Sequence, residues 1–349
     1  MGLVNDAHYS MRIAQCRVGY ARYEPPPRHQ LMAQSVLLVK TSSLGDLIHA
    51  LPAVSDLKAA LPGCSLAWVV EESLVAIPRL HAGVDHIIPV ALRRWRRSFW
   101  RSGVRAEMAA FAARLRLRSY DAVIDAQGLF KSAVITLAAR GRRHGLDFHS
   151  AREPLRPFYH HVYRVGWNIH AVERNRALVA QALGYTPASA CDYGITAQAR
   201  GFDWLAAGDY AVLLHATSGD YKLWPEAGWI ALAESFNARG LRCVLTWGSA
   251  KEHARCVRLS AHMRASVIAP ALNFDALAGL FAGAAAVVGV DTGLTHLSAA
   301  LGVPTVGIYC GTDPAATGIY GGARARNVGG IGLVPSVAEV LAALAAVGG

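Results

Sequence analysis

The stretch of sequence that decides the fold is Val36-Leu-Leu-Val-Lys-Thr-Ser-Ser-Leu-Gly-Asp46-Leu-Ile-His-Ala-Leu51. It begins with an aliphatic run, residues 36–39, that is typical of a buried parallel strand. Small polar residues follow. Beyond Gly45, apolar residues recur at about helical spacing, although Pro52 removes one backbone donor and is expected to kink the first turns. The pattern predicts a strand, a turn and a helix, with Asp46 near the N-cap position of that helix.

Asp46 has two interpretations. Aspartate is a preferred N-cap residue, so its carboxylate can serve only to bind the free N–H groups of the first helical turn. A carboxylate at the carboxyl end of a strand is also a candidate catalytic base. Further residues elsewhere in the chain are needed to favour the second role.

Strand and helix patterns alternate along the chain, which is typical of parallel sheets covered by helices. The strands of the first half are expected at about 36–40, 66–70, 87–90 and 121–125. Those of the second half are expected at about 210–215, 241–247, 266–269, 286–290 and 304–309. The 349 residues are enough for two α/β domains, and the boundary is expected between Gly184 and Gly208.

Residues 1–31 are expected to be a disordered or non-native leader. They lack the apolar core of a signal peptide, and Met32, which stands just before the first strand, is the expected start of the protein. The longest apolar stretch, Ala276 to Val290, has 15 residues, fewer than the roughly 20 that span a bilayer. It is expected to be a helix followed by a buried strand.

Several common sites are absent from the sequence. The six cysteines show no spacing typical of zinc, so no metal site is expected. No Gly-x-x-x-x-Gly-Lys-Ser/Thr element occurs, and no Gly-x-Gly-x-x-Gly motif follows the first strand. These absences disfavour a P-loop ATPase and a nicotinamide dehydrogenase.

The formal charge of +11 is unevenly distributed. No acid lies between Asp85 and Glu107, where six arginines are interleaved with three aromatic residues: Arg93, Arg94, Arg96, Arg97, Arg101, Arg105, Trp95, Phe99 and Trp100. Guanidinium groups pair well with phosphates, and the aromatic rings could lie at a membrane surface or against a sugar. The alternative is a solvated basic helix face. Nucleic acid is a further possibility, although no recognised binding module surrounds the arginines.

The second half contains a candidate phosphate site, Val287-Val-Gly-Val-Asp-Thr-Gly-Leu-Thr-His-Leu297. A helix that starts near Thr292 presents free N–H groups and the positive end of its dipole to a diphosphate, and Gly293 permits close approach. Thr292 and His296 can donate hydrogen bonds, whereas Asp291 suits sugar hydroxyls. A plain strand-to-helix turn capped by Asp291 is the alternative.

A second loop could bind the same diphosphate. Lys222 follows Thr217 and Ser218 after another predicted strand, which places one positive charge and two hydroxyls at a strand end. The alternative is a solvated lysine with two residues that form turn hydrogen bonds.

Together these segments resemble the bacterial ADP-heptose:lipopolysaccharide heptosyltransferases, and among them the heptosyltransferase I group. The resemblance runs from about Val36 to about Gly322. Its most specific segments are Val39-Lys-Thr-Ser-Ser-Leu-Gly-Asp46, Trp68-Val-Val-Glu-Glu72, the arginine segment from Ile88 to Arg97, Tyr120 to Leu129, Ala151-Arg-Glu-Pro154, His215-Ala-Thr-Ser218, Lys222-Leu-Trp-Pro-Glu226 and Val290 to Leu297.

The resemblance implies a GT-B fold, with two Rossmann-like α/β domains whose parallel sheets face each other across a cleft. Residues 32–190 would form an acceptor-binding domain and residues 191–334 an ADP-heptose-binding domain. Residues 335–349 would be a helix that returns toward the first domain; Ser336 and Glu339 form a capping box ahead of it. The implied reaction is an inverting transfer of L-glycero-D-manno-heptose from ADP-heptose to the inner Kdo of Kdo2-lipid A.

The resemblance also implies roles for individual residues. Asp46 would be the general base that deprotonates the acceptor hydroxyl. The donor would be bound by Thr217, Ser218, Lys222, Thr292 and Gly293 at the diphosphate, with His296 nearby, Asp291 on heptose hydroxyls, Glu252 on the ribose and Leu272 against adenine. The acceptor would be bound by Arg93, Arg94, Arg96, Arg97 and Arg143.

The remaining expectations concern partners and alternatives. No cofactor or metal is required, although Mg²⁺ could stimulate the reaction. The protein is expected to be a cytoplasmic monomer at the periphery of the inner membrane that does not bind nucleic acid. Heptosyltransferase II, or a related transferase with another core acceptor, is the alternative of the same class. A nucleotide-sugar epimerase and a nucleic-acid-binding protein are alternatives of other classes.

Overall fold

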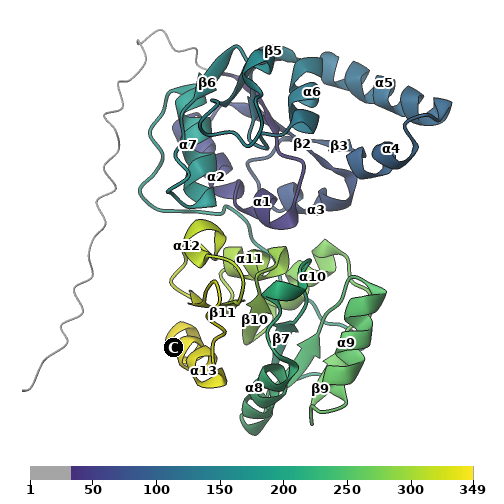
Figure 1. Ribbon diagram of the computed structural model, residues 1–349, viewed down its shortest axis with the longest axis vertical. Coiled ribbons are helices and arrows are strands. Elements are labelled where there is room, and N and C mark those ends of the chain that lie inside the picture. Colours follow the sequence, from purple (N-terminus) through teal and green to yellow (C-terminus); the bar gives the residue numbers. More distant parts are fainter. Residues whose placement is uncertain (1–32, 349) are drawn as a thin grey trace, which may run out of the picture.

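The computed structural model describes residues 33–348; the expected leader, residues 1–31, lies outside this part of the chain. The described residues form two parallel six-stranded sheets, each covered by helices, and one domain lies above the other in Figure 1. The expected α/β class with two parallel sheets is confirmed.

The first sheet has the strand order β3-β2-β1-β4-β5-β6. Its strands are β1 (Ser35–Val39), β2 (Ser65–Glu71), β3 (His86–Val90), β4 (Ser119–Asp125), β5 (Arg140–Leu146) and β6 (His161–Tyr163). Its helices are α1 (Leu44–Ile48), α2 (Leu51–Ala60), α3 (Ala76–Arg79), α4 (Leu92–Ser98), α5 (Ser102–Arg116), α6 (Phe130–Ala138) and α7 (Ala171–Leu183), with 3₁₀ turns at Glu72–Leu74 and Arg156–Phe158. The four expected strands are present, and β1 lies between β2 and β4, which explains its aliphatic sequence.

The second sheet has the strand order β12-β11-β10-β7-β8-β9. Its strands are β7 (Tyr210–Leu214), β8 (Arg242–Leu245), β9 (Ser266–Ile268), β10 (Ala286–Val290), β11 (Thr305–Tyr309) and β12 (Ala325–Gly329). Its helices are α8 (Glu226–Ala238), α9 (Ala250–Ser260), α10 (Phe274–Ala282), α11 (Gly293–Ala300), α12 (Pro314–Thr317) and α13 (Val337–Gly348), with a 3₁₀ turn at Asp220–Lys222. The apolar stretch from Ala276 to Val290 is a helix end and a buried strand, as predicted.

Three strands were not expected from the sequence. β5 has the sequence RGRRHGL, which carries no β-branched residue and no alternating apolar pattern. It forms because the neighbouring strand β4 supplies a hydrogen-bonding edge from Arg140 to His144. The short strands β6 and β12 extend the sheets in the same way, beside β5 and β11.

The helix after the first strand differs from the expected single kinked helix. The chain instead forms two helices, α1 and α2, and Pro52 occupies the first turn of the second one. This is a favourable place for proline, because an N–H group in the first turn has no helical acceptor.

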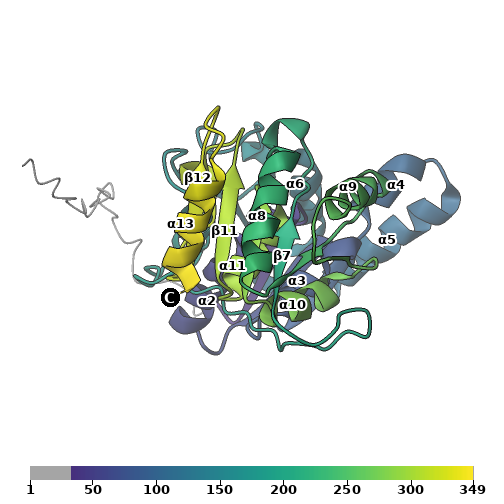
Figure 2. The ribbon, with the colours of Figure 1, turned by 90° about the horizontal axis from the view of Figure 1, so that it is seen from below.

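The C-terminal helix α13 also differs from its expected position. The capping box is present, since Ser336 N and Ser336 Oγ both donate to Glu339 Oε2 at 2.7 Å. The helix does not return to the first domain. It packs on β11, β12 and α8 of the second domain (Figure 2), where Val340, Leu344 and Val347 join the buried core.

The connection between the domains carries no helix or strand from residue 184 to residue 209, apart from a bridge between His81 and Ile195. Its first part is bound to the first domain. Arg176 of α7 pairs with Asp56 of α2 at 2.7 Å and also donates to the carbonyl of Ala190 at 3.1 Å. The precise boundary between residues 190 and 191 stays a prediction.

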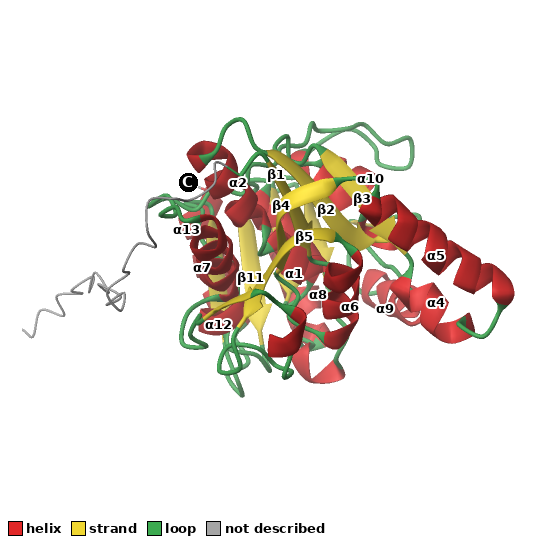
Figure 3. Cartoon of the chain, turned by 90° about the horizontal axis from the view of Figure 1, so that it is seen from above, coloured by secondary structure: helices red, strands yellow, loops and turns green. Residues whose placement is uncertain are grey.

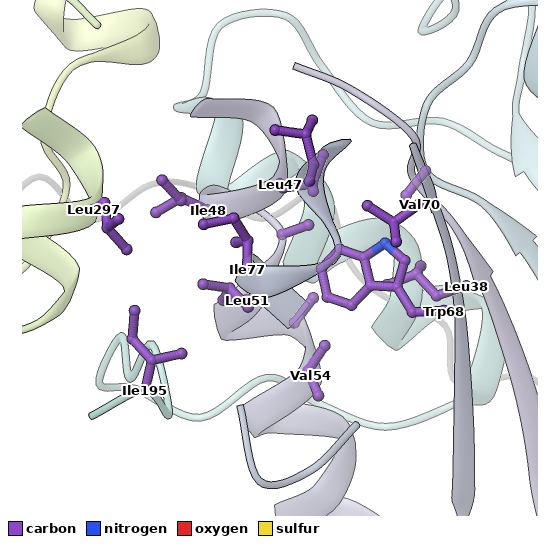
Figure 4. Packing of buried hydrophobic residues seen from close by; sticks show 14 of the residues in the cluster. Leu38, Leu47, Ile48, Leu51, Val54, Trp68, Val70, Ile77, Ile195 and Leu297 are labelled. Carbon is purple, nitrogen blue, oxygen red and sulfur yellow. The ribbon is translucent and has the colours of Figure 1, made fainter. Parts of the chain in front are cut away.

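One buried apolar cluster extends through both domains. In Figure 4, Leu47, Ile48 and Leu51 of the first domain lie toward Leu297 of α11 and Ile195 of the connection, and all five belong to this cluster. The two domains are therefore in direct apolar contact near α1. Within residues 33–348, no helix is both long enough and apolar enough to cross a membrane.

Candidate active site

Asp46 lies in the first turn of α1, directly beyond the carboxyl end of β1. Its Oδ2 accepts hydrogen bonds from Ser43 N at 2.7 Å and from Ser43 Oγ at 2.8 Å, so the pair forms a capping box. The N-cap is Ser43 and not Asp46, which corrects the expected position by three residues. The carboxylate is partly exposed, and the cap holds it in place.

The loop that precedes Asp46 is held by residues that follow β4. Gln127 Oε1 accepts hydrogen bonds from the backbone N–H groups of Thr41 and Ser42, both at 3.0 Å. Lys131 Nζ donates to Ser42 Oγ at 3.1 Å. The segment 125–131, which follows the parallel neighbour β4, thus positions the Asp46 loop.

Lys40 adds a buried positive charge near Asp46. Its Nζ donates to the carbonyl of Ala126 at 2.7 Å. Burial lowers the pKa of the Lys40 ammonium, and the carboxylates of Asp46 and Asp125 counteract this effect.

Asp291 is the centre of the second-domain site. It follows β10 and precedes α11, whose N-cap is Thr292. Asp291 Oδ2 accepts hydrogen bonds from Lys222 Nζ at 2.8 Å and from Thr312 Oγ1 at 2.7 Å, and His296 Nε2 lies 3.8 Å from Asp291 Oδ1. Burial alone would raise the pKa of Asp291, but His296, Lys222 and Thr312 outweigh it and hold the pKa well below its usual range.

The two phosphate-binding segments expected from the sequence are brought together here. Thr217 Oγ1 donates to the backbone carbonyl of Asp291 at 2.7 Å, and Lys222 pairs with the Asp291 side chain. Lys222 is thereby held at the start of α11. Thr312 was missed by the sequence analysis, although it follows the parallel strand β11 and so ends at the same sheet edge.

Three other residues that were expected to bind ADP-heptose lie at this edge without a direct contact to Asp291. Ser218 is exposed in the loop after β7. Glu252 lies in the first turn of α9, where its Oε2 accepts a hydrogen bond from Gly248 N at 2.6 Å. Leu272 follows β9 and packs against the interdomain cluster. Since β7, β8, β9 and β10 are parallel neighbours, all these loops leave the same side of the sheet.

The turn that carries Asp46 lies directly against the turn that carries Asp291. A Cβ placed on Gly293 would lie 2.6 Å from Leu44 Cγ and 2.8 Å from Gly45 N, and one placed on Gly45 would lie 3.4 Å from His296 Cδ2. At Gly293 only glycine permits this approach of the two turns, whereas a Cβ at Gly45 would make an ordinary contact with His296. The α1 turn occupies the space that Gly293 leaves open by having no side chain.

A group of histidines crosses the same interface and was not anticipated. His49 of the first domain packs edge-on against His296 of the second with ring centroids 4.6 Å apart, and against His170 at 5.4 Å. His170 stacks on Tyr320 at 4.5 Å and its Nε2 lies 3.1 Å from the carbonyl of Gly318, both in the second domain. No sequence pattern joins these residues; only the domain packing does.

The expected acceptor-binding arginines fall into three groups. Arg93, Arg96 and Arg97 are exposed on α4. Arg94 is instead bound by Glu72 at 3.2 Å and Glu107 at 2.7 Å, beside a hollow of about 420 Å³ between α4 and α5 that these carboxylates also line.

Arg143 lies on β5, where its Nε donates to the carbonyl of Phe158 at 2.8 Å. Strands β2, β1 and β4 lie between β5 and β3, the strand that precedes α4. The structure therefore does not bring Arg143 together with the α4 arginines.

Comparison with known protein families identifies the family to which this two-domain site belongs. Residues 108–336 match the family model for glycosyltransferase family 9, the heptosyltransferases. The chain belongs to glycosyltransferase family 9. It is therefore a glycosyltransferase, as the resemblance implied.

Curated members of family 9 are closely similar to the chain. Lipopolysaccharide heptosyltransferase 1 of Pseudomonas aeruginosa is 48% identical over 289 residues, which cover 82% of this chain and 81% of the relative. Lipopolysaccharide heptosyltransferase 1 of Escherichia coli K12 is 45% identical over 289 residues, which cover 82% of this chain and 91% of the relative.

Solved structures of family 9 enzymes share the fold. The E. coli heptosyltransferase WaaC with ADP has a TM-score of 0.81 and 41% identity and covers 88% of this chain and 98% of its own. WaaC has also been solved with ADP-2-deoxy-2-fluoro heptose, with a TM-score of 0.78. E. coli heptosyltransferase II, at 21% identity and a TM-score of 0.72, shows the fold alone. The GT-B arrangement expected of this family 9 member is confirmed.

Among residues 33–348, no group of three or more His, Cys, Asp or Glu side chains is placed to bind a metal ion. Whether Mg²⁺ affects this family 9 enzyme stays a prediction. The donor side of the site carries its own cation in Lys222 and a free helix N-terminus in α11, both of which can interact with a diphosphate.

Proposed function

We propose that this family 9 glycosyltransferase transfers L-glycero-D-manno-heptose from ADP-heptose to the inner Kdo of Kdo2-lipid A, with inversion at the anomeric carbon. The relatives named lipopolysaccharide heptosyltransferase 1 support this substrate class, and WaaC with ADP-2-deoxy-2-fluoro heptose supports the donor. The observation that carries the mechanism is the contact between the Asp46 turn and the Asp291–His296 turn.

The proposed reaction is a direct displacement. Asp46 accepts the proton of the acceptor hydroxyl while the hydroxyl oxygen forms a bond to the anomeric carbon of heptose. The bond from that carbon to the diphosphate breaks, and ADP leaves with the electron pair on the opposite face. Lys222 and the N–H groups at the start of α11 stabilise the charge that grows on the diphosphate.

Asp46 and Lys40 fit this scheme together. The Ser43 hydrogen bonds leave the Asp46 carboxylate partly exposed while restricting its rotation. Lys40 is buried in the same loop region and keeps a positive charge close to it. A carboxylate that is held in place and open to solvent on one side suits the deprotonation of a sugar hydroxyl.

The exposed arginines of α4 are proposed to bind the anionic acceptor. Arg93, Arg96 and Arg97 follow the carboxyl end of β3, on the same sheet edge as Asp46. Their guanidinium groups suit the phosphates and carboxylates of Kdo2-lipid A. Because this acceptor is a membrane lipid, we also propose that the enzyme acts at the cytoplasmic face of the inner membrane.

The test is the substitution Asp46→Asn, with ADP-heptose and Kdo2-lipid A as substrates. We expect kcat to fall by about 10²- to 10⁴-fold, the usual contribution of a general base, with nearly unchanged affinity for ADP. A variant that keeps most of its kcat would remove Asp46 from the role of base.

Glu339→Gln is the matched control, because Glu339 has the same capping-box geometry at the start of α13. This control should lose a little stability and no activity. An acceptor that already carries one heptose is the second substrate. Transfer to it in preference to Kdo2-lipid A would favour a heptosyltransferase II activity instead.

A further inference from the structure

The helical hairpin of α4 and α5, residues 92–116 and here called the arm, projects from the β3 side of the first domain (Figures 1 and 3). Its base is well anchored. Trp95 packs edge-on against Phe111 with ring centroids 5.6 Å apart, and Trp95 Nε1 donates to Glu107 at 2.8 Å. The arm is therefore a folded element with a defined direction.

The tip of the arm carries two large aromatic side chains that face solvent. Phe99 is 61% exposed and Trp100 is 60% exposed, and their rings touch edge-on at 5.3 Å between centroids. The turn beneath them is ordered by hydrogen bonds from Arg101 N to the carbonyl of Ser98 at 3.0 Å and from Arg105 Nη1 to the carbonyl of Trp100 at 3.3 Å. Two adjacent aromatic side chains that are exposed to solvent indicate a surface that binds a membrane or another partner.

The charge around this pair is strongly positive. Four arginines flank it, namely Arg96, Arg97, Arg101 and Arg105, and within the described chain none of them forms an ion pair. The only acid of the arm, Glu107, is occupied by Arg94 and Trp95. The tip therefore presents two exposed aromatic side chains on a segment whose flanking arginines form no ion pair within residues 33–348.

This combination fits an anionic lipid surface better than a groove-bound ligand. Tryptophan is enriched where hydrocarbon meets headgroups, arginine stems can lie along apolar surface while their charged ends bind phosphate, and basic clusters are attracted to anionic leaflets. The hairpin projects from the domain (Figures 1 and 3), so its tip can reach such a layer.

We propose that the arm tip is a membrane anchor, which inserts Phe99 and Trp100 among the headgroups of an anionic bilayer while the flanking arginines bind lipid phosphates. This proposal rests on the proposed function in one respect, namely that the acceptor lies in that bilayer. Attachment to the membrane does not itself require the transfer reaction. It would hold the acceptor-binding arginines of α4 within a few helical turns of the membrane surface.

The first test is cosedimentation of the whole protein with vesicles of phosphatidylcholine containing about one third phosphatidylglycerol. We expect binding that is lost in pure phosphatidylcholine, and a fall of about tenfold or more for the double variant Phe99→Ser/Trp100→Ser, which keeps every arginine. Trp100→Phe should bind nearly as well as the unchanged protein.

The matched control is Val134→Ser/Leu137→Ser, which removes two comparably exposed apolar side chains, 46% and 51% exposed, from the outer face of α6. This control should bind vesicles normally. Circular dichroism checks that each variant folds. Unchanged binding by the tip variant, or loss of binding only in the α6 variant, would overturn the proposal.

The second test separates attachment from chemistry. Heptose transfer is measured to Kdo2-lipid A in the same vesicles and to a deacylated, water-soluble fragment of that acceptor. The tip variant should lose at least tenfold activity on the vesicle acceptor and keep its activity on the soluble fragment. Loss on the fragment with normal vesicle binding would mean that the tip contacts the sugar and would overturn the proposal. Failure of the unchanged protein on both acceptors would contradict the proposed function and leave the vesicle result standing.

Discussion

At the level of single residues, Asp291 accepts hydrogen bonds from side chains that are distant in the sequence, Lys222 and Thr312. The Lys222–Asp291 pair is largely shielded from solvent, whereas the nearby Lys251–Asp220 pair is almost fully exposed. Exposed pairs of that kind contribute little to stability. The two lysines therefore offer a matched comparison of a site residue and a surface residue.

Lys222→Ala is expected to weaken donor binding and slow transfer together, with a loss in kcat/KM of about 10²-fold. The variant should also unfold more easily by about 1–3 kcal/mol, because Asp291 loses a charged hydrogen-bond donor. Steady-state kinetics with ADP-heptose and chemical denaturation measure both effects. Lys251→Ala should match the unchanged protein in both, and unaltered kinetics in Lys222→Ala would contradict the assignment to the diphosphate.

At the level of elements, the run of arginines divides because a helix presents its residues on different faces. All four arginines are exposed, but Arg94 also forms ion pairs with Glu72 and Glu107. Charge and sequence spacing alone made these four residues equivalent. The positions of Glu107 on α5 and of Glu72 after β2 separate their roles.

Arg97→Ala is expected to raise the acceptor KM several-fold without a change in donor affinity or thermal stability. Arg94→Ala should also lower the unfolding temperature, but only slightly, because its two ion pairs at the base of the arm are half exposed. Acceptor and donor titrations, with thermal unfolding, test this difference. Arg239→Ala, an exposed arginine at the end of α8, is the control. Equal shifts in acceptor and donor KM for Arg97→Ala would count against an acceptor role.

At the level of the whole molecule, His49 and His170 at the domain interface make the stability of the folded protein depend on pH. Burial lowers the pKa of His49 well below its usual value, and His296, His170 and Lys40 lower it further. Burial also lowers the pKa of His170 to about 4. His170 Nδ1 accepts a hydrogen bond from Val172 N at 3.1 Å, so protonation would remove a helix cap as well.

The direction of the pH effect follows from these pKa values. Unfolded histidine takes up a proton near pH 6.5, whereas His49 and His170 in the folded protein resist protonation. Their contribution to stability is therefore complete above about pH 6.5 and falls as the pH drops from there toward 4. We expect the unfolding temperature to be several degrees lower at about pH 5 than at about pH 7.5.

His170→Asn tests this prediction, because asparagine can still cap α7 but does not titrate. The variant should show a smaller fall in unfolding temperature between the two pH values. His262→Asn, a change at an exposed histidine after α9, should behave like the unchanged protein. An equal pH dependence in all three proteins would show that the interface histidines are not responsible.

The regular parts of this fold were predictable because their signals are local. The aliphatic run at 36–39, the apolar stretch before Asp291 and the Ser336–Glu339 capping box each specify an element through neighbouring residues. Strand β5 was not predictable, since its basic sequence pairs only because β4 lies beside it. The position of α13 was also missed, because an apolar helix face can pack on either domain and only the space beside β11 and β12 decides between them.

By itself, the sequence determined the two α/β halves, the turns that carry Asp46 and Asp291, and the membership of a glycosyltransferase family. These depend on short-range patterns and on motifs whose residues are adjacent in the chain. Only the tertiary structure decided that Gly45 and Gly293 bring those turns together, that Thr312 completes the Asp291 site, and that Arg143 lies apart from the other arginines. These contacts join residues from distant parts of the chain, and they depend on how the domains pack, which no local sequence pattern encodes.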